Sequence, residues 1–340
     1  MKRSFTVVLP VLFGLSFITA ALSAADALPN AKAGTIRAGM IGLDTSHVVA
    51  FAQMLNDPKA AGELAQLKIV AGYPGGSRDI PSSWNRVEGY TKELRGMGVE
   101  IVDSIDELLK KVDVVLLMSV DGRPHLAQAR PVIAAGKPLF IDKPMAASLA
   151  DAMEIFRLAE EKHVPCFSAS SLRFSSGFQA ARGKDSRFGE VKSCTAWGPL
   201  HLEPHHPDLF WYGIHGVETL YTIMGPGCQT VTRPAADKVV GVWAGGRTGT
   251  FVAKEDYGAD VQGSKANGSA GKYEGYRPLV VEIVRFFKTG QPPVTSAETL
   301  EIMAFMEAAD ESKRLGGAAV SIESVMRKAG RKGPVSAQGQ

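Results

Sequence analysis

The sequence is poor in cysteine and has no excess of charge of either sign. Its 340 residues include three cysteines, and no two of them have the CxxC or CxxxC spacing of a thiolate metal site or a redox pair. The 38 basic residues nearly balance the 35 acidic ones, and no dense basic run precedes the C-terminal tail. The composition therefore gives no indication of a surface for nucleic acid or anionic lipid.

The one long apolar run opens the chain. Lys2 and Arg3 precede apolar residues 5–21, and small residues follow at 21–25. This order is typical of a secretory signal peptide, with an uncleaved membrane anchor as the alternative. We expect a signal peptide over residues 1–25 and a linker over 26–34.

Lys2 and Arg3 are not a twin-arginine pair, so export would follow a Sec-type route. The mature protein would be periplasmic or extracellular and free of the membrane. Export would permit one disulfide, although buried free thiols are the simpler expectation for Cys166, Cys194 and Cys228.

Strand-like and helix-like segments alternate between residues 35 and 170. Strands are expected at 35–43, 67–73, 99–103, 112–119, 138–142 and 164–169, with helices between them. This alternation predicts an α/β fold with a doubly wound parallel sheet of the Rossmann type.

The pattern changes after residue 170. Strand-like segments at 190–197, 229–232, 239–244 and 248–253 are joined by helices at 216–224, 279–289 and 296–315. This order predicts a second domain over 171–322, with an antiparallel sheet packed on helices. The polar residues from 323 to 340 are expected to form a disordered tail.

The turn after the first expected strand carries a partial glycine motif. A dinucleotide site needs a Gly-rich turn there, because the diphosphate rests on the N-terminus of the next helix. Against G-x-G-x-x-G, Gly42 fits the first place, while Asp44 and His47 occupy the second and third. Asp44 adds bulk and negative charge. The turn is either a modified nucleotide site or a helix cap in which Asp44 or Thr45 replaces the ligand.

The second expected strand ends at Tyr73, without the acidic residue that binds the ribose in NAD sites. Ser77 and Arg78 follow shortly afterwards. They would either hold the 2′-phosphate of NADP or form a polar turn.

A longer stretch carries more specific motifs. Residues 112–115 read VDVV, residues 121–125 read DGRPH, and residues 135–146 read AGKPLFIDKPMA. This order resembles the glucose–fructose oxidoreductase, inositol dehydrogenase and rhizopine-catabolism family (Gfo/Idh/MocA), which has a "TPN…H" loop and strands ending in "EKP". The resemblance extends over residues 36–322.

The resemblance implies a Rossmann domain followed by an α/β domain with an open, mainly antiparallel sheet, which often carries a homo-oligomer interface. It implies oxidation or reduction of a hydroxyl on a sugar or cyclitol, with NAD or NADP as the cofactor. Free nicotinamide nucleotides are scarce outside the cytoplasm, so an exported enzyme would have to keep its cofactor tightly bound.

The resemblance also assigns catalytic residues. Lys143 matches the lysine of the EKP motif, with Asp142 in place of Glu. His215 matches the family's general acid/base, but Trp211 stands where its carboxylate partner is expected. The expected cofactor-binding residues are Gly42, Leu43, Asp44, Thr45, Ser46, His47, Ser77, Arg78, Ser119, Asp121 and His125.

Four of the seven histidines lie between residues 201 and 215. They would form a substrate pocket, a metal site or a polar loop, and the spacing matches no known metal signature. We expect no metal and assign substrate contacts to Arg173, His205, His206, Asp208, Trp211 and Tyr212. Arg173 has an interdomain ion pair as its alternative role.

Two functions remain open from the sequence. The first is an exported oxidoreductase in which Lys143 and His215 manage the proton of a sugar or cyclitol hydroxyl. The second is a cofactor-free carbohydrate-binding or regulatory protein that kept the fold.

Overall fold

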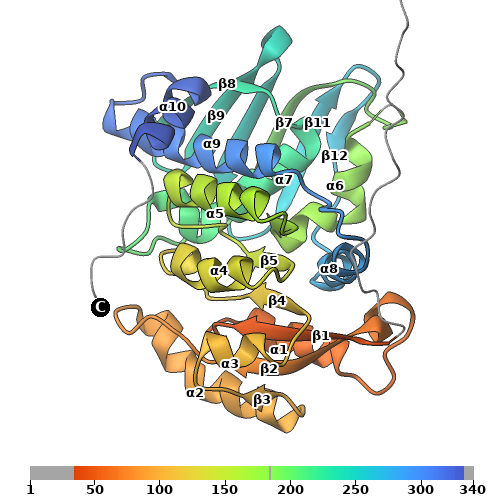
Figure 1. Cartoon of the computed structure of the whole chain (residues 1–340). Coiled ribbons are helices and arrows are strands. Elements are labelled where there is room, and N and C mark those ends of the chain that lie inside the picture. Colours follow the sequence, from red (N-terminus) through yellow and green to blue (C-terminus); the bar gives the residue numbers. More distant parts are fainter. Residues whose placement is uncertain (1–33, 184, 333–340) are drawn as a thin grey trace, which may run out of the picture.

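Two sheets with helices packed on them make up the computed structural model, which describes residues 34–183 and 185–332 (Figure 1). The first sheet contains β1 (Ile36–Ile41), β2 (Leu67–Tyr73), β3 (Glu100–Ile101), β4 (Val114–Leu117), β5 (Leu139–Asp142) and β6 (Cys166–Ala169). All neighbouring strands are parallel, in the order β3-β2-β1-β4-β5-β6. This is the strand order of a dinucleotide-binding fold, so the predicted doubly wound sheet is confirmed.

Five helices connect these strands, namely α1 (Ser46–Leu55), α2 (Pro81–Gly96), α3 (Ile105–Leu109), α4 (His125–Ala134) and α5 (Leu149–Glu161). Ser104 caps α3, because its hydroxyl accepts the Glu107 N–H at 3.2 Å. The strand order reverses between β1 and β4. Their carboxyl ends therefore border the crevice in which folds of this type bind ligands.

The second sheet follows the order β12-β11-β7-β10-β9-β8-β13, and only the β7–β10 pair is parallel. Its strands are β7 (Val191–Gly198), β8 (Cys228–Ala235), β9 (Lys238–Trp243), β10 (Thr248–Ala253), β11 (Gly258–Gly263), β12 (Asn267–Ser269) and β13 (Val320–Ser321). The helices of this half are α6 (Ser176–Ala181), α7 (Ile214–Met224), α8 (Arg277–Thr289), α9 (Ser296–Arg314) and α10 (Ile322–Lys332). The predicted mainly antiparallel sheet is confirmed, while β11, β12 and β13 were not expected.

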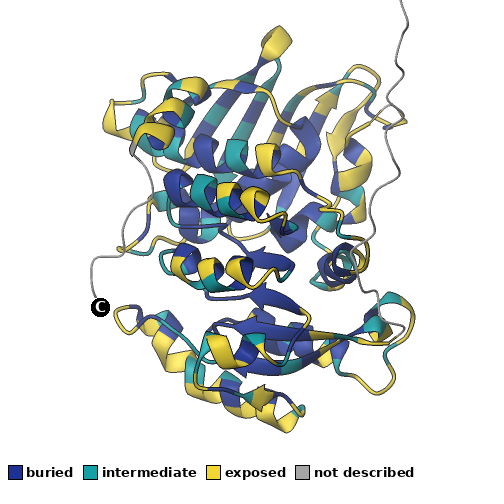
Figure 2. Ribbon diagram, viewed as in Figure 1, coloured by how far each residue is buried: buried dark blue, intermediate teal, exposed yellow. Residues whose placement is uncertain are grey.

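Helix α8 packs on the first sheet although it comes from the second half of the chain (Figure 1). Its apolar side packs in the same buried cluster as the first sheet, and the rings of Phe286 and Phe167 meet edge on at 4.7 Å. The change of pattern near residue 170 therefore separates the two sheets. The buried cluster of the first sheet nevertheless includes α8 from the second half of the chain. Figure 2 shows the same arrangement as buried strands with exposed residues on the outer sides of the helices.

The prediction of a disordered tail from residue 323 is wrong for residues 323–332, which form most of α10. Ile322, Val325 and Ala329 are buried there and Met326 packs beside them, which is the apolar stripe of an amphipathic helix. The three cysteines are buried and free, as expected. Within the described residues no helix is long and apolar enough to cross a bilayer. The predicted signal peptide and residues 333–340 lie outside the described residues.

Candidate active site

Gly42 makes the turn between β1 and α1 possible. Its φ is +83°, and a Cβ there would lie 2.2 Å from the Ser119 hydroxyl oxygen and 2.5 Å from the Ser119 nitrogen. Only glycine fits this position. Thr45 caps α1, because its hydroxyl accepts the His47 N–H at 3.4 Å. Gly42 therefore has the tight-turn role of the motif's first glycine, and Thr45 is the residue that caps the helix.

Asp44 is fully buried just before α1, and the partners of its carboxylate come from other elements. Its carboxylate accepts the Val120 N–H at 3.0 Å and the Ser83 hydroxyl at 2.6 Å. The Ser83 hydroxyl in turn accepts the Ser77 N–H at 2.8 Å. Burial raises the pKa of Asp44, and the hydrogen bonds from Ser83 and Val120 oppose that shift. Asp44 thus ties the turn after β1 to the loop after β4 and to the first turn of α2.

Asp121 forms a second link across the ends of the strands. It accepts the Ser77 hydroxyl at 2.6 Å and an Arg123 N–H at 2.8 Å, and His206 Nε2 lies 3.0 Å away. Burial disfavours the charged carboxylate, but His206, Arg123 and Ser77 outweigh burial and hold the pKa of Asp121 well below its usual value. The loops after β2 and β4 are therefore bonded directly to each other.

The other predicted nucleotide contacts have structural partners. The Ser77 hydroxyl is engaged by Asp121, and the guanidinium of Arg78 lies over the Trp84 ring, 4.4 Å from its centroid. This arrangement favours the polar turn over a 2′-phosphate site. The ring nitrogens of buried His125 lie 2.8 Å from the Ser119 carbonyl and 3.2 Å from the Met145 carbonyl, where the ring braces the loop after β4.

Lys143 follows β5 and is buried. Its ammonium lies 5.9 Å from the centroid of the Tyr212 ring, and its side chain has no hydrogen bond or ion pair within residues 34–183 and 185–332. Burial lowers the pKa of Lys143, and the charge of Asp142 opposes this. An unpartnered amine with a lowered pKa has a larger neutral fraction, so Lys143 can accept a proton as well as donate one.

His47 connects the start of α1 to the end of β5. Its Nδ1 lies 2.7 Å from a carboxylate oxygen of Asp142, and both side chains are buried. The other carboxylate oxygen of Asp142 has no hydrogen-bond partner. Burial disfavours the charge of Asp142, but His47 and Lys143 together hold its pKa below the usual value. His47, which stands in the third glycine place, thus has Asp142, the neighbour of Lys143, as its specific partner.

His215 lies in the first turn of α7, and its Nδ1 is 2.7 Å from the Ser170 hydroxyl. Burial lowers the pKa of His215 well below its usual value, and the charges of Lys143 and His47 act in the same direction. The imidazole is therefore neutral at pH 7. Its polar partner is Ser170, a residue that the sequence did not single out.

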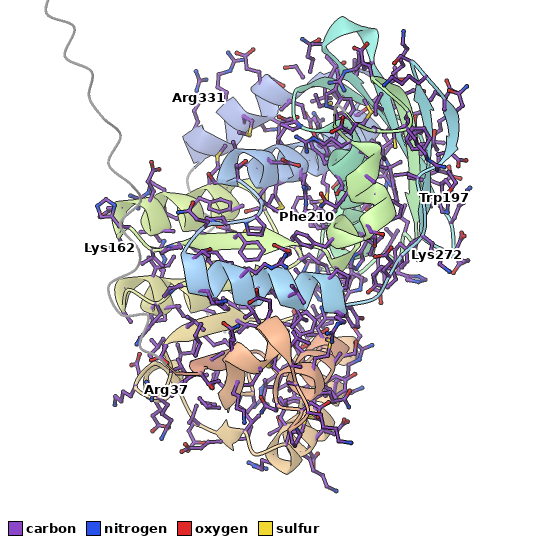
Figure 3. The ribbon with its side chains drawn as sticks, turned by 90° about the vertical axis from the view of Figure 1, so that its right-hand side faces the viewer. Arg37, Lys162, Trp197, Phe210, Lys272 and Arg331 are labelled. Carbon is purple, nitrogen blue, oxygen red and sulfur yellow. The ribbon has the colours of Figure 1, made fainter. Side chains whose placement is uncertain are left out.

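Tyrosine rings join the two halves of this site. Ring contacts with centroid distances of 4.7–6.3 Å run from His215 through Tyr257, Tyr273 and Tyr276 to His47. Tyr212 contacts His215 from another side, at 5.9 Å. The sequence analysis assigned no site role to any residue after 256, although residues 257–276 contain three of the seven tyrosines. Figure 3 labels Lys272 on this segment, where it leads from the second sheet to α8.

Arg173 and Asp208, both predicted to contact substrate, have other partners. Arg173 pairs with Glu218 and, at 2.8 Å, with Glu298. All three residues lie within 171–322, so Arg173 forms ion pairs inside the second domain rather than between domains. Asp208 forms ion pairs with two basic residues, Arg233 at 2.9 Å and Lys313 at 2.6 Å. Neither Asp208 nor Glu218 replaces the missing carboxylate partner of His215.

The histidine-rich segment is divided between several neighbours. His205 and His206 both contact Glu203, at 2.9 and 3.1 Å, and the Trp211 ring packs on His206 at 4.8 Å. His215 lies apart from them, on Ser170. Among the described residues no group of three or more His, Cys, Asp or Glu side chains could hold a metal ion.

The crevice between β1 and β4 does not fit a dinucleotide in its usual pose. The second glycine place should leave room for the diphosphate, but the buried Asp44 carboxylate fills it. The N–H groups of Gly42 and Leu43 donate to the carbonyls of Tyr73, which ends β2, and Pro74, at 2.9 and 2.6 Å. Ser46, at the start of α1, is the one exposed residue of 42–47, and its side chain hydrogen bonds to Tyr276.

The first domain matches one family model. Residues 36–170 match the model of GFO_IDH_MocA, an oxidoreductase family with an NAD-binding Rossmann fold. The uncharacterized oxidoreductase YhhX of Escherichia coli K12 is 27% identical over 138 residues, which are 37% of this chain and 40% of that protein. The chain thus matches less than half the length of this relative.

Solved structures extend the likeness to both domains. The myo-inositol dehydrogenase of Lactobacillus casei, in complex with NAD(H) and myo-inositol, is 14% identical with a TM-score of 0.65, over 84% of this chain and 96% of that one. An oxidoreductase of Agrobacterium radiobacter, in complex with NAD+, L-tartaric acid and magnesium, is 17% identical with a TM-score of 0.65, over 85% and 99%. At these identities the likeness shows the fold.

Proposed function

Because residues 36–170 match the model of the Gfo/Idh/MocA oxidoreductase family, which has an NAD-binding Rossmann fold, we propose that the chain binds a sugar or cyclitol beside β5 and exchanges a proton with one of its hydroxyls. The observation that carries this proposal is the pairing of Lys143 with His215. Both are buried, both adjoin Tyr212, and the pKa of each is lowered by burial.

The two side chains suit proton transfer at a hydroxyl. When Nδ1 of His215 donates to Ser170, Nε2 is left free to accept a proton from the substrate. Lys143 has no competing partner, so its amine can bind the same oxygen and stabilise the charge that forms there. The tyrosine rings offer the mostly apolar walls against which a sugar ring packs.

Oxidation of the hydroxyl would also need a hydride acceptor, which the family takes as NAD. Lys143 and His215 act only on the proton of the hydroxyl. The myo-inositol complex of the Lactobacillus casei enzyme supports a cyclitol as the first ligand to try.

Calorimetric titration of the purified chain with myo-inositol and a panel of sugars tests the proposal. Lys143→Met and His215→Asn should each weaken binding about tenfold or more, because each removes a hydrogen bond to the ligand in a buried site. Lys162→Met, at an exposed lysine after α5, is the matched control and should bind as the wild type does. Equal binding by all variants would contradict the proposal.

We further propose that residues 1–25 direct export, on the strength of their basic, apolar and small-residue order. Cell fractionation with N-terminal sequencing measures this. A mature protein that begins near Asp26 in the periplasm or medium is the expected result, and a cytoplasmic protein that retains Met1 would contradict export.

The second sheet is our candidate for a homo-oligomer interface. Figure 3 shows helices on one of its faces and Trp197 on the other. Light scattering of the purified protein should therefore give a multiple of the monomer mass, and a monomer at micromolar concentration would refute the interface.

A further inference from the structure

Both side chains that replace glycines of the nucleotide motif have specific partners across the ligand crevice. Asp44 reaches the Val120 N–H after β4 and the Ser83 hydroxyl on α2. His47 reaches Asp142 at the end of β5. In a dinucleotide site these two places are left without side chains, so that the diphosphate can approach and the helix can pack closely.

We propose that Asp44 is an internal anion that takes the place of the cofactor's diphosphate, so that this chain does not hold NAD or NADP in the usual pose. The inference does not rest on the proposed sugar or cyclitol site, which could operate with or without a dinucleotide. It would make the Lys143–His215 site independent of nicotinamide, as in a carbohydrate-binding or regulatory protein.

The hydrogen bonds of the crevice are already used by the chain itself. Val120 donates its N–H to Asp44, while Gly42 and Leu43 donate theirs to the carbonyls of Tyr73 and Pro74. A diphosphate would have to replace each of these bonds. It would also displace a fully buried carboxylate that has two donors.

Arg123 is already paired with carboxylates and is not free to bind a diphosphate. Arg123, the cation beside the loop after β4, is held between Asp79 and Asp121 at 2.8 Å from each. A diphosphate placed beside Asp44 would meet a like charge at short range, where repulsion at an effective dielectric near 20 lowers affinity by a factor on the order of 1,000.

A second hydrogen bond joins the two loops that border the crevice. The Ser77 hydroxyl of the loop after β2 donates to Asp121 after β4, at 2.6 Å. In a dinucleotide site the end of β2 binds the adenosine ribose. Contacts within the protein therefore take the place of two parts of the nucleotide, the diphosphate and the ribose.

Titration of the intact mature chain with NADH and NADPH, followed by calorimetry and nucleotide fluorescence, tests the proposal. The wild type should show no binding at micromolar concentrations. Asp44→Gly should bind at least on the order of 100-fold more tightly, because it removes both the charge and the side chain. Asp44→Asn keeps the volume and removes the charge, so a smaller gain is expected.

Two controls make the outcome specific. Asp256→Asn, at an exposed aspartate, should bind no better than the wild type. Circular dichroism and thermal unfolding establish that each variant is folded, and Asp44→Asn carries the test if Asp44→Gly does not fold. Micromolar binding by the wild type, or a dinucleotide that co-purifies with it, would overturn the proposal. Folded Asp44 variants that gain no affinity would overturn the role of Asp44.

Discussion

Replacing His47 by alanine should destabilise the protein by about 3–5 kcal/mol, because it leaves the buried carboxylate of Asp142 without its side-chain partner. The environment of Asp142 makes the loss large. One carboxylate oxygen already lacks a hydrogen bond, and the other depends on the 2.7 Å contact with His47. The expected decrease in melting temperature is about 5–15 °C.

A double-mutant cycle separates the interaction energy of the His47–Asp142 contact from the packing contribution of the imidazole ring. Asp142→Asn should also destabilise the protein, whereas His47→Ala combined with Asp142→Asn should lose about 1–3 kcal/mol less than the sum of the single variants. Denaturant unfolding followed by circular dichroism gives the three free energies. A loss below about 1 kcal/mol for His47→Ala, with no coupling, would refute the contact.

The same pair predicts a pH dependence. The pKa of Asp142 is lower in the folded protein than its usual value, since His47 and Lys143 outweigh the effect of burial. The resulting stabilisation is present above the unfolded pKa of about 3.9 and is lost as the pH falls through the folded pKa. The stability gap between wild type and His47→Ala should therefore narrow below about pH 4. A gap that is constant with pH would show that the charge of Asp142 is not involved.

Two further predictions follow from the backbone and the thiols. Gly42→Ala should lower stability by about 3 kcal/mol or more in denaturant unfolding, because its Cβ would lie 2.5 Å from the Ser119 nitrogen at a φ of +83°. Gly89→Ala, in α2 with open space around it, is the control and should be neutral or stabilising. Burial raises the pKa of Cys166 and of Cys228 to about 12, so a thiol reagent at pH 8 should label them only after unfolding, and rapid labelling of the native protein would contradict their burial.

Local patterns were sufficient to predict most of the secondary structure. Val114–Leu117 is an uninterrupted apolar run because β4 is buried on both faces. The helix expected at 296–315 begins at Ser296, where the Thr295 hydroxyl caps it by accepting the Glu298 N–H at 3.2 Å. The prediction failed at α10, although Ile322, Val325, Met326 and Ala329 have the spacing of an amphipathic helix there.

The candidate site was predicted only in part. Lys143 and His215 could be named because each lies in a recognisable motif, and the structure places both against Tyr212. Their other neighbours come from distant segments, such as Ser170 after β6 and Tyr276 before α8. Histidines 205 and 206, close to His215 in sequence, contact Glu203 instead.

The sequence by itself determined the alternation of strands and helices and the glycine turn at residue 42, because these depend on local periodicity and backbone geometry. Lys143 was singled out by the resemblance of its motif to a known family. The sequence also showed that Asp44 and His47 replace glycines, but it could not say what they contact. Only the tertiary structure decided that, because their partners Val120 and Asp142 are more than 70 residues away and meet them where parallel strands end at one edge of the sheet.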